Sequence, residues 1–211
     1  MINFDSLIPN DERLAAVAKD LAEFGKWVAG MGEKSIPPIA NVVCIDFRSG
    51  EYKTTLETII MDGFPDDPEK RLMGFHQLAM HIVAEQGLMP IAFVLACEAW
   101  VSDIEIKNDN EGLPDSTVPI VLPEDGDRFE AFVIQGMTIS RRYVGAIYEM
   151  RRRHDETLAL VESTKFNNFN VYDGKRTYNG MIAAFFTGAA EAFAKYEKSK
   201  GNDDSDPIDN S

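Results

Sequence analysis

The sequence predicts a single α+β domain in which three helices pack against a mixed, mostly antiparallel sheet of about six strands. Apolar residues recur at helical spacing over residues 11–30, 68–86 and 178–198. Elsewhere apolar and polar residues alternate, as they do in strands with one face toward a core. Residues 91–97 are all apolar, a run too short to cross a membrane and typical of a strand buried on both faces.

The first helix is expected over residues 11–30, with Asn10 as its N-cap and with Gly30 and Gly32 ending it. Its apolar stripe comprises Leu14, Val17, Leu21, Phe24, Val28 and Met31. The stripe resembles a short heptad seam, which would pack on a helix of a partner. Because it is shorter than three heptads, packing on the chain's own sheet is the preferred interpretation.

Residues 41–48 and 52–60 alternate and are separated by Ser49-Gly50, which predicts a β-hairpin. A second helix is expected to begin with Asp67 as N-cap and Pro68 at the first helical position. Its inward-facing residues are predicted to be Leu72, Phe75, Leu78, Ala79, Ile82 and Val83, and Gly87 closes it. The buried strand follows directly, so the chain passes from strand to helix to strand. If those two strands lie parallel, the crossover should be right-handed.

The second half of the chain begins with a long polar connection, residues 107–128, and connections of this length in compact domains are usually functional or disordered. Three further strands with short turns, a meander, are expected over residues 129–139, 143–152 and 157–165. In the last helix the small residues Ala184, Gly188 and Ala192 permit close approach of a neighbour. Residues 201–211 carry four aspartates and no lysine or arginine, which predicts a disordered acidic tail after a domain of residues 1–200.

The composition excludes several classes of function. A net charge of -14 repels phosphate backbones and anionic lipid, so neither generic nucleic-acid binding nor membrane association is expected. Cys44 and Cys97 lie in apolar runs and are expected to behave as buried hydrophobes. The chain lacks nucleotide-binding and serine-hydrolase motifs, and its three histidines are not spaced as metal ligands, so no cofactor or metal is expected. The first residues lack a signal-peptide pattern, which predicts a cytoplasmic protein.

Glu98 is the most informative polar residue, because it ends the buried apolar run and a buried carboxylate must be paired, protonated or near water. It is a candidate catalytic residue, acting as a general acid or base with Asp46 or Asp103 as the second carboxylate. The alternative, which is preferred, is that Glu98 pairs with an arginine or caps the sheet beside Trp100.

A group of arginines departs from the acidic background. If the two central strands of the meander form a hairpin, these side chains lie at its opposite ends and make two small basic patches. The residues are Arg141, Arg142, Arg151, Arg152 and Arg153. Each patch could hold a phosphate or a carboxylate of a partner, whereas pairing with the protein's own surplus acids is the preferred interpretation.

Two short motifs carry a resemblance. The first is Glu98-Ala99-Trp100-Val101, and the second opens the next strand as Pro123-Glu124-Asp125-Gly126-Asp127-Arg128-Phe129-Glu130-Ala131. Over residues 41–152 the chain resembles a loose group of uncharacterised bacterial and phage α+β proteins. The resemblance implies a bacterial or phage setting. It also implies that Glu98, Trp100, Arg128 and Glu130 act as a set, with Arg128 as the partner of Glu98.

The leading hypothesis for function is a non-enzymatic, acidic interaction protein, or a structural or accessory protein of phage or bacterial origin. Its partner would be another protein or a second copy of itself, in the host cytoplasm or in a virion. This hypothesis follows from the absence of a complete catalytic set, the strong acidity and the long polar connection. The competing hypothesis is a small hydrolase or transferase that uses Glu98, with Arg128 holding an anion.

Overall fold

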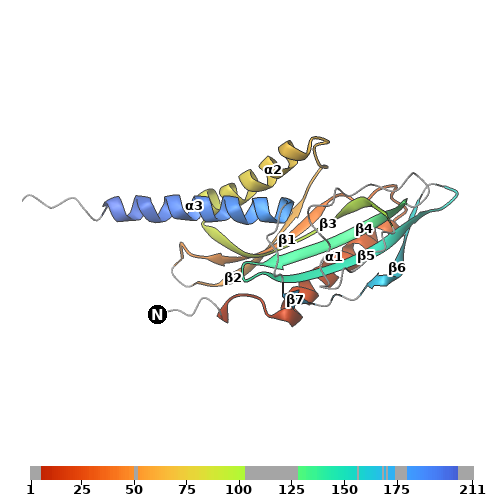
Figure 1. The fold of residues 1–211 in the computed structure, drawn as a ribbon, viewed down its shortest axis with the longest axis horizontal. Coiled ribbons are helices and arrows are strands. Elements are labelled where there is room, and N and C mark those ends of the chain that lie inside the picture. The colour runs from red at the N-terminus through yellow and green to blue at the C-terminus, as the bar shows by residue number, and fades with distance from the viewer. Residues whose placement is uncertain are drawn as a thin grey trace, which may run out of the picture.

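The computed structural model describes residues 6–49, 52–102, 128–155, 157–167, 169, 171–173 and 180–203. Within these ranges three α-helices and a seven-stranded sheet form an α+β fold, which confirms the predicted class (Figure 1). In chain order the elements are α1 (Asp11–Gly30), β1 (Ile39–Asp46), β2 (Thr54–Ile60), α2 (Pro68–His81), β3 (Leu88–Ser102), β4 (Arg128–Thr138), β5 (Arg142–Arg152), β6 (Leu158–Asn167), β7 (Tyr172–Asp173) and α3 (Met181–Asp203). Most of the predicted long connection and residues 204–211 of the predicted tail lie outside the described residues, and α3 continues to Asp203.

The strand order is β2-β1-β3-β4-β5-β6, with β7 beside β5. The sequence predicted a mixed sheet, but every pairing among the described strands is antiparallel. The reason is that β1 lies between β2 and β3, which run in the same direction without pairing with each other. Pro90 lies in β3 where the register with β1 shifts, a position that tolerates the missing N–H of proline.

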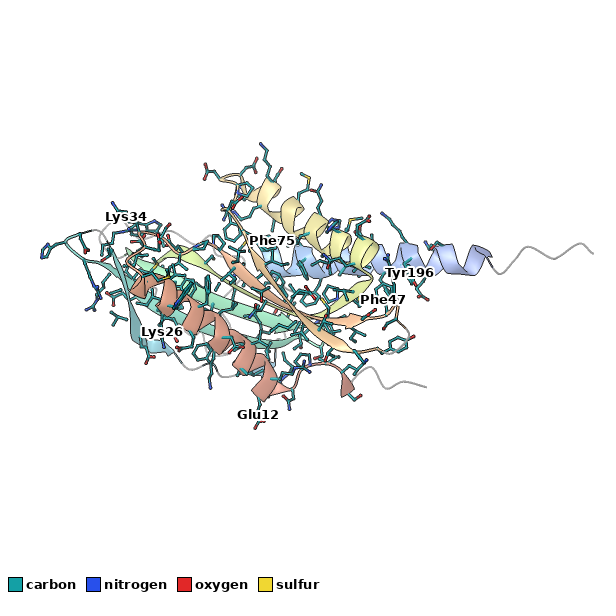
Figure 2. The ribbon with its side chains drawn as sticks, turned by 180° about the vertical axis from the view of Figure 1, so that it is seen from behind. Glu12, Lys26, Lys34, Phe47, Phe75 and Tyr196 are labelled. Carbon is teal, nitrogen blue, oxygen red and sulfur yellow. The ribbon has the colours of Figure 1, made fainter. Side chains whose placement is uncertain are left out.

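The sheet separates two apolar cores. On one face α1 packs over β3 side chains such as Val94 and Ala96, and on the other face α2 and α3 pack over Phe93 and Leu95. All of residues 91–97 are buried, which confirms the predicted strand with two covered faces. In Figure 2, α1 crosses one face of the sheet diagonally, and Phe47, the residue after β1, lies beside Tyr196 of α3, with ring centroids 4.8 Å apart.

α1 begins and ends as predicted. The side chain of Asn10 accepts the N–H of Arg13 at 2.9 Å, and Asp11 and Glu12 occupy the first turn, where negative charge suits the helix dipole. In the middle of the helix, a Cβ on Gly25 would come within 2.5 Å of the ring of Phe132. The glycine therefore allows α1 to lie close against β4.

α2 starts at the predicted cap, where Asp67 accepts the N–H groups of Glu69 and Lys70. After His81 it continues as one π-helical segment, Ile82–Gln86, which ends at Gly87 in the left-handed conformation at φ 71°. Leu72 was predicted to face inward but is 37% exposed, whereas its predicted companions are buried or partly buried. No helix in the described part of the chain is long and apolar enough to span a membrane.

Candidate functional site

Three residues of the predicted set meet at one end of the sheet, on the face that α1 covers. Glu98 lies opposite Phe132, and Trp100 lies opposite Glu130 in the β3–β4 register. Phe132 belongs to the core beneath α1, so the alternation of side chains places Glu98, Trp100 and Glu130 on that same face. Trp100 is 69% exposed there. Arg128 pairs with Ser102 through its backbone, and its side chain lies outside the described residues.

The carboxylate of Glu98 holds the segment that connects α1 to β1. Its Oε1 accepts the backbone N–H of Ile36 at 2.5 Å, and the side chain of Ile36 is itself buried. Burial raises the pKa of Glu98, while the N–H of Ile36 counteracts the rise. The charge of Glu130 adds to the rise, and the charge of Arg152 opposes it. Glu98 therefore fastens the connecting segment to the central strand.

Arg152 reinforces the same attachment from β5. Its guanidinium contacts the carboxylate of Glu130 at 2.5 and 3.0 Å and donates to the carbonyl of Lys34 at 3.0 Å. Lys34 and Ile36 both belong to the connecting segment between α1 and β1, and Figure 2 shows Lys34 at this end of the molecule. Glu98 and Arg152 thus act on neighbouring points of one segment, as expected for groups that stabilise structure.

The two candidate partners of Glu98 in catalysis are not assembled with it. Asp46 lies opposite Leu88, ten residues before Glu98 along β3, which corresponds to about 33 Å. Its carboxylate accepts the N–H groups of Arg48 and Ser49, each at 3.0 Å, and these bonds hold the pKa of Asp46 below its usual value. Asp46 therefore caps the turn after β1. Asp103 lies outside the described residues.

The arginines divide between the two ends of the β4–β5 hairpin. Arg141 and Arg142 lie at its turn, while Arg151, Arg152 and Arg153 lie at the far end. Three of them form ion pairs with acids of the chain itself: Arg142 with Asp11, Arg151 with Glu149, and Arg152 with Glu130.

Within the described ranges, groups of three or more His, Cys, Asp or Glu side chains that could hold a metal ion do not occur. Cys44 and Cys97 are buried free thiols, and burial raises their pKa values to about 12 and about 11.

Replacing Glu98 with alanine is expected to lower the free energy of unfolding by about 1–3 kcal/mol, because the N–H of Ile36 loses its acceptor. Glutamine keeps an amide oxygen at that position, so Glu98→Gln should lose less. Urea unfolding of both variants and the wild type measures the difference. Equal losses for alanine and glutamine would contradict the hydrogen bond as the source of stability.

Comparison of Glu98→Gln with the wild type also tests the raised pKa of Glu98. A raised pKa means that the folded state binds the proton of the Glu98 carboxyl group more tightly than the unfolded state does. The stability that this proton contributes is complete at pH values below 4.5, the ordinary pKa of the group. That stability is lost as pH rises through the raised pKa. Glutamine does not titrate, so the stability of Glu98→Gln relative to wild type should increase as the pH rises above 4.5. A difference that does not change with pH would contradict the shift.

A second feature, the outer edge of β2, was not predicted as a site. Asp46 N donates to Lys53 O, and Met61 N donates to Pro38 O, so the odd-numbered residues of β2 hydrogen-bond to β1. The even-numbered residues point their N–H and C=O groups outward, and no described strand pairs with them. We call this feature the β2 edge; it comprises Thr54, Leu56, Thr58 and Ile60.

Two large apolar side chains of the β2 edge are exposed, Leu56 by 48% and Ile60 by 60%. They lie opposite Val43 and Ile39, whose side chains face α1, so they belong to the α1 face of the sheet. The path of α1 explains their exposure. α1 packs on β3, β4, β5 and β6 (Figure 2). Its first turn pairs with β5 through Asp11 and Arg142 and reaches β2 through the side chain of Arg13, which donates to Thr54. The segment after the helix meets the start of β6, where Glu33 O accepts Leu158 N. The helix therefore moves away from β2 and leaves it uncovered.

The opposite face of the sheet carries an apolar notch where the chain leaves β2. It has a volume of about 200 Å³ and is lined mainly by Met61, Phe64, Phe75 and Leu78, with Arg71 at its side. A larger, open depression of about 690 Å³ lies at the start of α1, but Asp11 and Arg142 in its lining already pair with each other. Apolar surface thus borders β2 on both faces of the sheet.

One signal in the sequence could have revealed the β2 edge. Residues 54–60, TTLETII, place apolar side chains on both faces of a strand that the hairpin supplies with one neighbour only. Glu57 is the sole charged residue in this stretch, and proline is absent from it.

Comparison with protein-family models, with curated proteins and with solved structures gives no match to the chain.

Proposed function

We propose that the chain is a non-enzymatic interaction protein that binds another protein by strand addition at the β2 edge. The observation that carries the proposal is the row of outward-facing N–H and C=O groups between exposed Leu56 and Ile60. In strand addition these backbone groups supply affinity, and alternate side chains supply specificity. Proteins usually protect an exposed edge with charges, proline or a bulge, and β2 has one charge on its other face.

Because the chain has a surplus of acidic residues, a contact at the β2 edge is favoured when the partner brings basic side chains to its rim. The resemblance to bacterial and phage proteins favours an accessory or structural component, in a bacterial cytoplasm or in a virion. The first point concerns the charge of the partner, and the second concerns the setting in which the protein acts.

The second candidate function is a small hydrolase or transferase centred on Glu98. It is favoured by one observation, the raised pKa of a half-buried carboxylate beside the charge of Glu130. Against it, Glu98 already bonds to the connecting segment, and Asp46 lies at the other end of the sheet. Turnover of ester or phosphoester substrates that disappears in a folded Glu98→Gln variant would favour this second candidate.

Selection from a library of displayed linear peptides tests strand addition. Wild-type protein immobilised at low density, as single copies, is expected to select peptides with apolar residues at alternate positions. A variant with Leu56→Lys and Ile60→Lys should bind these peptides at least about tenfold more weakly, because lysine charges protect an edge. The matched control carries Met73→Lys and Ile139→Lys, at side chains that are 53% and 43% exposed elsewhere on the surface. Selected peptides that bind both variants equally would refute strand addition at β2.

A further inference from the structure

We propose that the β2 edge is occupied by a second copy of the chain, which pairs antiparallel about a two-fold axis through Thr58. This inference rests on the proposed function and names its partner. In the resulting dimer, Leu56 of each copy lies opposite Ile60 of the other, and one sheet continues through both copies. A two-fold contact of this kind uses the same patch on both partners, so the patch must be complementary to itself.

The backbone restricts the register first. Only the even-numbered residues of β2 direct their N–H and C=O groups outward, because the odd-numbered residues already bond to β1. Two copies of β2 must therefore pair even-numbered residues with even-numbered residues. In an antiparallel pairing that meets this condition, the two-fold axis passes through a residue and not between two residues. That residue lies opposite its own copy in the second chain.

The side chains then select among these axes. An axis at Glu57 would place two like charges opposite each other, which is destabilising. An axis at Leu56 would leave Ile60 opposite Tyr52, outside β2, and an axis at Ile59 would place Leu56 opposite Asp62. With the axis at Thr58, the exposed side chain of Leu56 in each copy lies opposite the exposed side chain of Ile60 in the other, so the apolar contact forms twice. Glu57 lies opposite Ile59 of the second copy.

The charges that flank the strand fit the same register. Continuing the pairing by two residues brings Asp62 of the second copy opposite Thr54. The hydroxyl of Thr54 accepts a hydrogen bond from the guanidinium of Arg13 at 3.2 Å. The register therefore brings an exposed carboxylate of one copy to an exposed guanidinium of the other, and symmetry repeats the contact. These two contacts oppose the repulsion between copies that each carry a net charge of -14.

Light scattering coupled to size exclusion, over a range of concentrations, tests the pairing. We expect the wild type to form a dimer. Leu56→Lys with Ile60→Lys should raise the dissociation constant at least about a hundredfold, whereas Met73→Lys with Ile139→Lys should leave it unchanged. Arg13→Glu and Asp62→Lys should each weaken the dimer, and the two changes together should restore it. Failure of the double reversal to restore dimerisation would overturn the proposed register.

Cysteine trapping reports the register directly. Thr58→Cys should form a disulfide between copies, because opposed residues in a hydrogen-bonded antiparallel pair have Cα atoms about 5.5 Å apart. Glu57→Cys should trap only if the axis lies at Glu57, and Met73→Cys controls for random collision. Cys44 and Cys97 are buried and do not compete. Trapping at Glu57 in place of Thr58 would overturn the register.

The outcomes separate this inference from the function on which it rests. A wild-type chain that stays monomeric at the highest attainable concentration overturns self-pairing, and peptide selection on that monomer then judges strand addition by itself. A dimer that survives lysine at both Leu56 and Ile60 also overturns self-pairing, since its interface lies elsewhere. A dimer that is lost in that variant and is trapped through Thr58→Cys supports it.

Discussion

Replacing Phe93 with alanine is expected to lower the free energy of unfolding by about 3–5 kcal/mol. Phe93 is fully buried in the central strand β3. Its ring stacks on Phe185 of α3 at 4.2 Å between centroids and meets Phe75 of α2 edge-on at 5.8 Å. Alanine would leave a cavity under both helices and remove both aromatic contacts. Urea unfolding followed by far-UV circular dichroism measures the loss.

Phe64→Ala is the matched control for Phe93→Ala. The ring of Phe64 also contacts Phe75, at 5.7 Å, but it is only partly buried beside the surface notch. Its removal should therefore cost well under half as much as the removal of Phe93. Equal losses for the two variants would contradict Phe93 as the centre of this core.

The elements of the fold were predictable because local chemistry and tertiary packing agree in them. Asn10 and Asp67 cap helices in the structure as the sequence indicated, and Gly87 closes the second helical segment. The continuous apolar run in β3 predicted burial on both faces, and helices do cover both faces. The π-helical segment before Gly87 had no comparable signal, since its residues fit an α-helical stripe equally well.

The candidate site was harder to predict, because it depends on strand direction and order. Asp46 ends β1, and Glu98 lies near the end of β3, so a parallel pairing would have brought them together. The observed antiparallel pairing sends them to opposite ends of the sheet. Nothing within either strand specifies that choice. Glu130 was included in the predicted set, and the structure brings it near Glu98 because β4 pairs antiparallel with β3.

The β2 edge was missed for a related reason. Alternation of Leu56 and Ile60 with polar residues normally predicts a face turned to the core. Their actual exposure depends on the diagonal path of α1, which packs on β3, β4, β5 and β6 and reaches β2 through the side chain of Arg13. A pattern of apolar residues fixes which face of a strand they share, whereas coverage of that face depends on a distant element.

Replacing Gly188 with alanine is expected to lower the free energy of unfolding by about 1–3 kcal/mol. Helix propensity alone predicts the opposite sign, because alanine favours a helix interior over glycine by about 0.5–1 kcal/mol. A Cβ at this position, however, would come within 2.2 Å of the carbonyl oxygen of His76 in α2. That oxygen belongs to helical backbone and cannot rotate away as a flexible side chain could, so α2 and α3 would have to separate. Urea unfolding with a constant m-value measures the change.

Gly74 provides the control that separates packing from propensity. It also lies inside a helix, α2, but a Cβ added there meets no atom within 4 Å. Gly74→Ala is therefore expected to raise the free energy of unfolding by about 0.5–1 kcal/mol. The two substitutions add the same methyl group and should change stability in opposite directions. If both stabilise the protein, α2 and α3 do not cross as closely as the contact between Gly188 and His76 requires.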